Sequence, residues 1–321
     1  MDMIIQILLL ALGFVLLVKG ADWFVDGAAG IATKLGIPQL VIGLTIVAMG
    51  TSAPEAAVSI TAALQGSAEI TIGNVVGSNI LNILIILGIS ALVYPLVVAK
   101  TTIWADIPVM IGATILLFAL GYDGTVSRVD AIILLIAFAA YLAFLFYLTK
   151  KNQAAEKLLS SSDIEKEDES KPEKLFSLPK AILLTVVGLA LIILGSNFCV
   201  DSATAIARML GLSERFIGLT IVALGTSLPE LFTSVSASIK KNSDIAIGNI
   251  VGSNIFNILF IVGLSGLIIP VPFAEAFRFD TIIALAAAVL LFLFALPKKR
   301  LSRVSGIVML LAYLAYFIWI L

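Results

Sequence analysis

The sequence predicts an all-α membrane protein with ten transmembrane helices, arranged as two inverted five-helix repeats. Three observations lead to this prediction. The chain of 321 residues is 60% apolar and 13% charged, with a mean hydropathy of +1.13, whereas soluble domains are about 45–50% apolar and about 25% charged. The apolar residues fall into ten stretches long enough to span a bilayer. Two blocks of sequence recur at one fixed offset.

Each predicted span is an apolar stretch of roughly 20 residues or more, the length that a helix needs to cross the hydrocarbon core. The spans cover residues 3–32, 38–65, 70–96, 102–121, 127–149, 178–208, 213–239, 245–270, 276–296 and 302–320. The first and sixth are the longest, so we expect them to be tilted.

One polar segment, from Lys150 to Lys180, separates the fifth span from the sixth. It has too few apolar residues to bury, so we expect a flexible connector. The predicted division is a first repeat at 1–150, a cytoplasmic polar linker at 151–177 and a second repeat at 178–321.

The basic residues of the loops predict the orientation, because cytoplasmic loops carry an excess of lysine and arginine. If the spans alternate, one side of the membrane receives Lys34, Lys100, Lys150, Lys151, Lys240, Lys241, Lys298, Lys299, Arg300 and Arg303. The other side receives only Arg128, Arg208, Arg215 and Arg278. The sequence thus predicts a multi-pass protein of the plasma membrane with both termini outside the cytoplasm.

The repeated blocks lie 175 residues apart. Residues 42–55 read IGLTIVAMGTSAPE and residues 217–230 read IGLTIVALGTSLPE, with twelve of fourteen positions identical. Residues 70–83 read ITIGNVVGSNILNI and residues 245–258 read IAIGNIVGSNIFNI, with eleven of fourteen identical. Because each repeat has five spans, the second copy enters the membrane from the opposite side, which predicts a pseudo-twofold axis in the membrane plane.

The first block places a carboxylate directly after a helix break. Proline lacks an N–H group and glycine weakens the helix, so we expect freed carbonyls near Ala48 and Gly50. Such carbonyls are tolerated in a membrane only where they are buried or line a polar cavity. The residues of this pattern are Ala48, Gly50, Thr51, Ser52, Pro54 and Glu55, and again Ala223, Gly225, Thr226, Ser227, Pro229 and Glu230.

The second block places Ser78 four residues before Asn82, which puts both on one helix face, and Ser253 and Asn257 repeat the spacing. A single hydroxyl in a membrane helix usually bonds its own backbone, and a single glycine usually serves helix packing. This explanation fails for Glu55 and Glu230, because an intramembrane carboxylate without a partner is too costly. For Asp26 and Asp201, nearer the ends of their spans, a structural and a functional role both stay open.

If the two repeats meet, the candidate ligands are all hard oxygens from carboxylates, hydroxyls, amides and carbonyls. Such a set suits Ca²⁺, Mg²⁺, Mn²⁺ or Na⁺ and disfavours Zn²⁺ and copper. The chain has no histidine, which excludes an imidazole metal site. Protons can compete for two neighbouring carboxylates. No nucleophile–base pair is evident, so an enzyme is the least expected class.

At these residues the chain resembles the sodium/calcium exchanger family, within the cation/calcium antiporter superfamily. The doubled G-T-S-x-P-E and G-S-N-I-x-N motifs carry the resemblance, which extends over the whole chain. It implies exchange of several Na⁺ for one Ca²⁺, with no cofactor and no nucleic-acid partner. The large calcium-sensing domains of animal relatives are expected to be absent, as in prokaryotic members. The resemblance leaves the oligomeric state open, and it implies that the long first and sixth helices slide across the ion-binding core.

The resemblance also implies roles for individual residues. Ca²⁺ is expected between Glu55 and Glu230, with oxygens from Thr51 and Thr226. The expected Na⁺ ligands are Ser52, Ser227, Ser78, Ser253 and the carbonyls of Ala48 and Ala223, with Asn82 and Asn257 beside the site. Some family members, notably the potassium-dependent branch, carry aspartate at the position of Asn257. Its absence here predicts exchange that does not need K⁺.

Two other functions remain open from the sequence. A Ca²⁺/H⁺ antiporter would use the same paired carboxylates to exchange protons, although that branch has different motifs around them. A cation channel would conduct without counter-transport, and inverted repeats of broken helices fit alternating access better.

Overall fold

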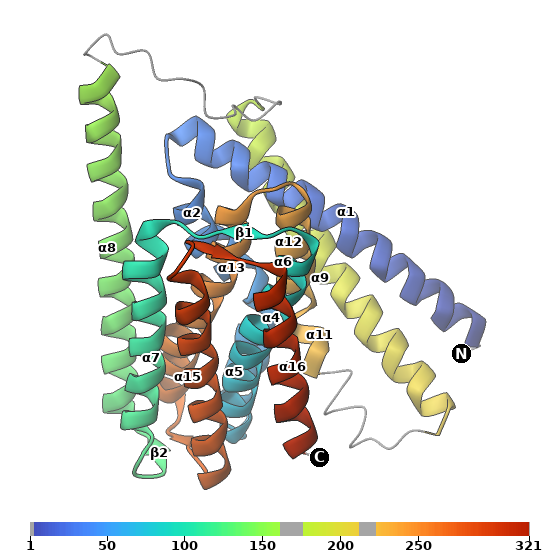
Figure 1. Cartoon of the computed structure of the whole chain (residues 1–321). Coiled ribbons are helices and arrows are strands. Elements are labelled where there is room, and N and C mark those ends of the chain that lie inside the picture. The colour runs from blue at the N-terminus through green and yellow to red at the C-terminus, as the bar shows by residue number, and fades with distance from the viewer. Residues whose placement is uncertain (1–2, 161–175, 212–222, 321) are drawn as a thin grey trace.

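The protein, described by a computed structural model over residues 3–160, 176–211 and 223–320, is a bundle of long helices (Figure 1). Among the described residues, eight helices are long and apolar enough to cross a membrane, and a bent pair, Gln39–Thr51 with Ala53–Leu64, is a ninth candidate span. The all-α membrane architecture is therefore confirmed. The predicted span 213–239 lies partly outside the described residues, and only its part from Ala223 onward is seen as helix.

The elements of the first half, in chain order, are α1 (Met3–Leu35), α2 (Gln39–Ile42), η1 (Gly43–Val47), α3 (Ala48–Thr51), α4 (Ala53–Leu64), α5 (Glu69–Leu81), η2 (Asn82–Leu87), α6 (Gly88–Val93), β1 (Leu96–Val97), η3 (Thr102–Asp106), α7 (Ile107–Leu120), β2 (Thr125–Val126) and α8 (Arg128–Ser160). Those of the second half are α9 (Leu178–Met209), α11 (Ala223–Thr226), α12 (Leu228–Ile239), α13 (Ser243–Phe256), η5 (Asn257–Val262), α14 (Gly263–Ile268), β3 (Val271–Pro272), α15 (Glu275–Ala295), β4 (Arg300–Leu301) and α16 (Arg303–Ile320). The elements η1, η2, η3 and η5 are π-helical turns.

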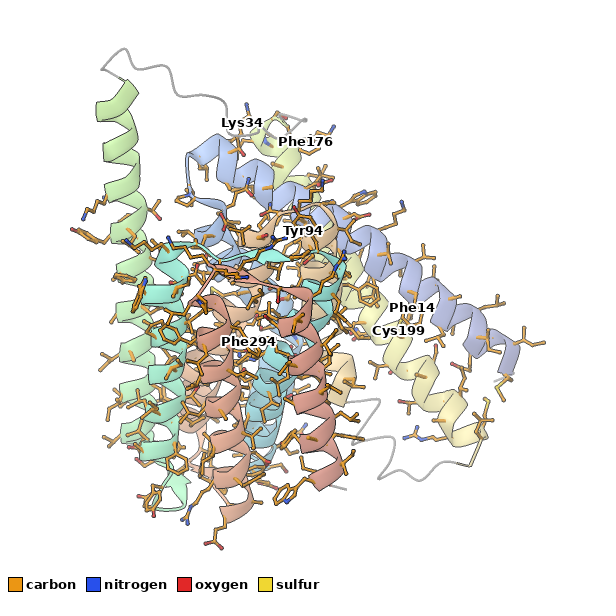
Figure 2. All side chains as sticks on the ribbon, in the orientation of Figure 1. Phe14, Lys34, Tyr94, Phe176, Cys199 and Phe294 are labelled. Carbon is orange, nitrogen blue, oxygen red and sulfur yellow. The ribbon has the colours of Figure 1, made fainter. Side chains whose placement is uncertain are left out.

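The two longest candidate membrane spans, α1 and α9, lie side by side and run obliquely past the upright helices of the bundle (Figure 1). Their seam is lined by glycines. A methyl group on Gly13 would meet the carbonyl oxygen of Gly195 at 2.9 Å, and one on Gly20 would meet that of Gly188 at 2.8 Å. Close approach of this kind is how membrane helices gain packing energy without a hydrophobic driving force. Cys199, the only cysteine in the chain, lies in the same seam near Phe14 (Figure 2).

The centre of the bundle is built from α4, α5, α12 and α13. All residues of α13 except Asp244 are buried, and α5 buries Ile72, Val75 and Ile80. The outer helices keep apolar side chains exposed, such as Trp104 and Ile136. This pattern is what a lipid-facing layer around a protein-buried centre requires.

The broken helix of the first half follows directly from its sequence. Ser52 leaves the helical region with φ −81° and ψ 9°, and α4 restarts with Pro54 in its first turn. The pair bends by 49° at this point. Ser227 repeats the geometry with φ −90° and ψ 5° before α12, where Pro229 takes the place of Pro54.

Short strands connect the two halves at opposite ends of the bundle (Figure 1). Leu96 pairs with Leu301 in the antiparallel pair of β1 and β4. Val126 pairs with Val271 in the pair of β2 and β3. Adding 175 to Leu96 gives Val271, and subtracting 175 from Leu301 gives Val126, so the offset of the repeat converts one strand pair into the other.

The helix α8 is longer than the predicted span, which ends at residue 149. It continues to Ser160, into the segment predicted as polar linker. The extension reads KKNQAAEKLLS, and its Ala, Lys, Gln, Glu and Leu residues are good helix formers even outside a membrane. The predicted flexibility of the rest of the linker falls on residues 161–175, which lie outside the described residues.

Candidate ion-binding site

Two glutamates lie deep inside the protein, each in the first turn of a restarted helix. Glu55 of α4 is 1% exposed and Glu230 of α12 is 0% exposed. The prolines before them are tolerated because a first-turn N–H has no helical partner. The positive end of each helix dipole favours the negative charge of the glutamate there.

Each glutamate is oriented by the other half of the chain. Ser52 Oγ donates a hydrogen bond of 2.7 Å to Glu230 Oε1, and Ser227 Oγ donates one of 3.2 Å to Glu55 Oε1. The Thr226 hydroxyl also faces the carboxylate of Glu55. These crossed bonds bring the two G-T-S-x-P-E motifs together, as the sequence predicts.

Thr51 and Ser253 face the carboxylate of Glu230. Thr51 Oγ1 lies 3.3 Å from the Ala48 carbonyl oxygen, and Ser253 Oγ lies 3.3 Å from the same oxygen. Ser78 Oγ lies 3.5 Å from Ser227 Oγ. The predicted hydroxyl ligands therefore gather around the two glutamates.

One oxygen of each glutamate is left over. Glu55 Oε2 and Glu230 Oε2 are buried and have no hydrogen-bond partner among the described residues. The two carboxylates lie close enough to interact electrostatically. Two buried negative charges with free oxygens are very costly in a membrane unless a cation compensates them. The surrounding oxygens are the hard ligands that Ca²⁺ and Na⁺ accept.

The helix breaks also free backbone carbonyls, as predicted. Pro229 cannot donate to Gly225, and the Gly225 carbonyl instead accepts a hydrogen bond of 2.8 Å from Ser196 of α9. Ala223 begins α11 directly after the undescribed residues 212–222, so the ligand role of its carbonyl stays a prediction.

Two asparagines that the sequence analysis did not single out anchor the glutamate-bearing helices. Asn74 Nδ2 donates to the Glu55 carbonyl oxygen at 3.1 Å and to a serine hydroxyl of the same helix at 2.9 Å. Asn249 Nδ2 donates to the Glu230 carbonyl oxygen at 3.3 Å, and its Oδ1 accepts from Thr51 at 3.0 Å. Asn74 and Asn249 occupy matching positions of the two repeats, and this repetition is the signal in the sequence that could have identified them.

A second asparagine network joins α5 to α13. Asn79 and Asn254, also not singled out from the sequence, each donate to the other's backbone carbonyl at 3.2 Å. Asn82 Nδ2 donates to Asn254 Oδ1 and Asn257 Nδ2 donates to Asn79 Oδ1, both at 3.0 Å. The Oδ1 atoms of Asn82 and Asn257 are buried without a partner among the described residues. Each of these two residues thus keeps one acceptor oxygen free within the described part of the chain, and their predicted place beside the ion site stays a prediction.

Comparison with known proteins agrees with this arrangement. The family model described as sodium/calcium exchanger protein matches residues 5–147 and 180–321. The sodium/calcium exchanger MaX1 of Methanosarcina acetivorans is 37% identical over 342 residues, covering 98% of this chain and 98% of the relative. The inner membrane protein YrbG of Escherichia coli is 39% identical over 268 residues, covering 84% of this chain and 81% of the relative.

Solved structures of the sodium-calcium exchanger NCX_Mj have the same fold. The form soaked with zero Na⁺ and Ca²⁺ superposes with a TM-score of 0.85 at 32% identity over 100% of both chains. The form soaked with 2.5 mM Na⁺ and 10 mM Sr²⁺ gives a TM-score of 0.84 at 32% identity, over 98% of this chain and 99% of that one. The family match over both halves, the full-length relatives and the paired motifs lead to one conclusion: this chain belongs to the sodium/calcium exchanger family.

Proposed function

We propose that this protein is an antiporter that exchanges Na⁺ for Ca²⁺ across the plasma membrane by alternating access. The observation that carries the proposal is the pair of crossed carboxylates, Glu55 and Glu230, each with one buried oxygen that no described residue engages. Two carboxylates balance the charge of one divalent ion. Neutral hydroxyl and carbonyl oxygens around them hold monovalent ions without adding charge.

The proposed ligands follow the geometry. Ca²⁺ binds between Glu55 and Glu230 with oxygens from Thr51 and Thr226. Further ligands serve Na⁺, namely Ser52, Ser78, Ser227, Ser253 and the carbonyls of Ala48 and Ala223. With three Na⁺ exchanged for one Ca²⁺, each cycle moves one net charge. The neutral side chain of Asn257 leaves no carboxylate there for K⁺, so exchange is independent of K⁺.

The proposed architecture is ten spans in two inverted repeats. The offset of the repeat converts one strand pair into the other, and reciprocal bonds join the matching residues Asn79 and Asn254. Both observations support this arrangement. The lysine-rich loops support a cytoplasmic location for one end of the bundle. There Arg300 pairs with Val97, and Lys241 lies over the ring of Tyr94. Both termini are then extracytoplasmic.

Alternating access is proposed to come from movement of α1 and α9 as a pair across the four central helices. Their oblique placement in Figure 1 and their continuous glycine seam support a unit that packs tightly within itself. The helix breaks at Ser52 and Ser227 support the proposal too, because discontinuous helices at the membrane centre are typical of secondary transporters.

A Ca²⁺/H⁺ antiporter is the second candidate, favoured by one observation. Two buried carboxylates that interact with each other can take up protons in place of a cation. A Ca²⁺/H⁺ antiporter needs no Na⁺ ligands. The hydroxyls that face the two glutamates therefore favour Na⁺/Ca²⁺ exchange.

The test is ⁴⁵Ca²⁺ uptake into proteoliposomes of the purified protein. Uptake driven by an outward Na⁺ gradient, at equal pH on both sides and with choline as the only other cation, supports the proposal. Adding K⁺ to the same vesicles should not increase the rate of ⁴⁵Ca²⁺ uptake. Uptake that follows a pH gradient and ignores Na⁺ would establish Ca²⁺/H⁺ exchange instead.

A further inference from the structure

Asn249 of α13 is a buried side chain that contacts both halves of the chain at the candidate ion site. It is 0% exposed. Its amide nitrogen donates to the Glu230 carbonyl oxygen at 3.3 Å and to the Ser234 hydroxyl at 2.9 Å. Its amide oxygen accepts a hydrogen bond of 3.0 Å from the Thr51 hydroxyl, which is 198 positions away in the chain. One side chain thus joins the helix that carries Glu230 to a hydroxyl of the other half.

The orientation of this amide is determined by its neighbours. A backbone carbonyl can only accept a hydrogen bond, so the group that faces the Glu230 carbonyl oxygen must be the NH₂ group of Asn249. The amide oxygen is then the group that meets Thr51. Asn74, the matching residue of the first half, makes the same two contacts, to the Glu55 carbonyl oxygen at 3.1 Å and to a serine hydroxyl at 2.9 Å. The same amide orientation therefore occurs in both halves.

The amide oxygen of Asn249 determines where the proton of the Thr51 hydroxyl lies. An amide oxygen has no proton to give, so Thr51 is the donor in this contact. A hydroxyl has one proton and two lone pairs, so both lone pairs of Thr51 remain available once the proton is donated to Asn249. A second acceptor, the Ala48 carbonyl oxygen, lies farther away, at 3.3 Å. Without Asn249 the proton would turn to this carbonyl, which is itself a proposed ion ligand.

We propose that Asn249 is a positioning residue of the ion site, which holds the Thr51 hydroxyl with its lone pairs available to the transported cation. The inference rests on the proposed function, in which Thr51 is a ligand of Ca²⁺. A cation binds the lone pairs of an oxygen, and a hydroxyl whose proton points at the ion cannot serve as a ligand. Removing a hydrogen-bond partner that orients a metal ligand typically lowers metal affinity 10–100-fold.

An amide that only anchored one helix to another would behave differently. Anchoring depends on the amide nitrogen of Asn249, which bonds the Glu230 carbonyl and the Ser234 hydroxyl of α12. It does not depend on which residue occupies position 51. Orienting a ligand depends on the amide oxygen and on a hydroxyl at position 51. Substitutions of Thr51 therefore separate the two roles.

The experiment measures Ca²⁺ binding to the purified full chain by calorimetric titration, with choline in place of Na⁺. We expect Asn249→Leu, which keeps the side-chain volume and removes the amide, to raise the Kd for Ca²⁺ roughly 10-fold or more. In a Thr51→Ser background, which keeps the hydroxyl, Asn249→Leu should raise the Kd by the same factor. In a Thr51→Val background, which removes the hydroxyl, it should change the Kd by less than about two-fold. Ser234→Ala removes an anchoring contact, leaves the amide oxygen in place and should not change the Kd.

Two results would overturn the inference. One is a Kd that Asn249→Leu leaves unchanged in the otherwise unsubstituted chain. The other is an equal rise in the Thr51→Ser and Thr51→Val backgrounds, which would mean that the amide only anchors helices. Should Asn249→Leu fail to fold, Asn249→Thr takes its place in every comparison, because its hydroxyl is one bond closer to the backbone and so recedes from Thr51.

A parallel titration of Glu230→Gln separates this inference from the proposed function. Ca²⁺ binding that Glu230→Gln leaves unchanged would contradict both, because the central carboxylate would then not be a ligand. Ca²⁺ binding that is lost in Glu230→Gln but unchanged in Asn249→Leu would contradict the role of Asn249 alone.

Discussion

Ser52 donates a hydrogen bond of 2.7 Å to Oε1 of Glu230, although the two residues are 178 positions apart in the chain. Ser227 and Glu55 make the mirror contact. Each repeat therefore supplies a carboxylate and the hydroxyl that orients the carboxylate of the other repeat. In the proposed function, neither half contains a complete ion site by itself.

The crossed bonds predict a specific pattern of coupling. Ser52→Ala removes a hydrogen bond to a charged group, which contributes about 1.5–3 kcal/mol, so we expect Ca²⁺ affinity to fall roughly 10-fold or more. Combined with Glu230→Asp, which already breaks this contact, Ser52→Ala should add little. Combined with Glu55→Asp it should act additively. Calorimetric titration of the three single and two double variants with Ca²⁺ measures this, and equal coupling to both glutamates would contradict the crossed arrangement.

The paired carboxylates predict that Glu55→Gln and Glu230→Gln each abolish Ca²⁺ transport. An amide removes one of two charges that balance the ion and cannot bind it through two equivalent oxygens. Glu69→Gln, at an exposed glutamate in the first turn of α5, is the control and should transport normally. Near wild-type ⁴⁵Ca²⁺ exchange by either central variant would show that the residue is not a ligand.

A salt bridge between α1 and the centre predicts a shift in conformational populations. Lys240 Nζ lies 2.7 Å from Asp26 Oδ1 and donates to the Asp22 carbonyl oxygen at 2.7 Å. The charged groups are partly exposed, so the bridge contributes about 0–1 kcal/mol. Lys240→Gln or Asp26→Asn should therefore raise the share of the alternative state by at most roughly five-fold.

Spin labels at positions 34 and 69, in a Cys199→Ala background, report this population through their distance distribution. The control is Lys241→Gln, which removes the lysine over Tyr94 and leaves the bridge intact. Identical distributions in the Lys240 variant and the unsubstituted chain would mean that the bridge does not distinguish the states.

The charge balance of the site predicts sensitivity to voltage. If three Na⁺ exchange for one Ca²⁺, one charge crosses per cycle, and its free energy changes by about 2.3 kcal/mol per 100 mV. The Ca²⁺ gradient at equilibrium should then change by a factor of roughly 50 per 100 mV, with an inside-negative potential assisting Ca²⁺ export. Proteoliposomes clamped with valinomycin measure this gradient. A gradient that ignores voltage would indicate an electroneutral exchange of two Na⁺ or two protons.

The sequence predicted the all-α membrane architecture and the burial of Glu55 and Glu230, because both depend on local information. The length of an apolar stretch identifies a membrane span. A glutamate that follows a proline inside such a stretch is recognisable without knowing which residues it contacts. The partner of Ser52 was not predictable from the sequence. Helical spacing relates Ser52 to Glu55 one turn away, whereas packing between α3 and α12 brings Glu230 to it. Lys240 was placed in a loop by its charge, and its contact with Asp26 appears only once α1 lies against α12.

The asparagines illustrate the same limit. Asn74 and Asn249 lie within the repeated blocks, but nothing in the spacing says that their amides bond the backbone of another helix. Asp106 is a clearer case, since its carboxylate faces the hydroxyl of Tyr141, which is 35 residues later in the chain. Contacts between helices follow from their packing, which one sequence does not specify.

The glycine seam between α1 and α9 has a consequence for the leakage of ions across the membrane. Gly13, Gly20 and Gly27 bring α1 so close to α9 that no side chain or lipid fits between the backbones. The helix α1 comes from the first half of the chain and α9 from the second. The seam therefore joins one helix of each half into a single closely packed unit. If α1 and α9 move as one unit, as we propose, the ions are uncovered toward only one compartment at a time. Tight packing between two helices that carry none of the proposed ion ligands would then keep the membrane sealed during every cycle.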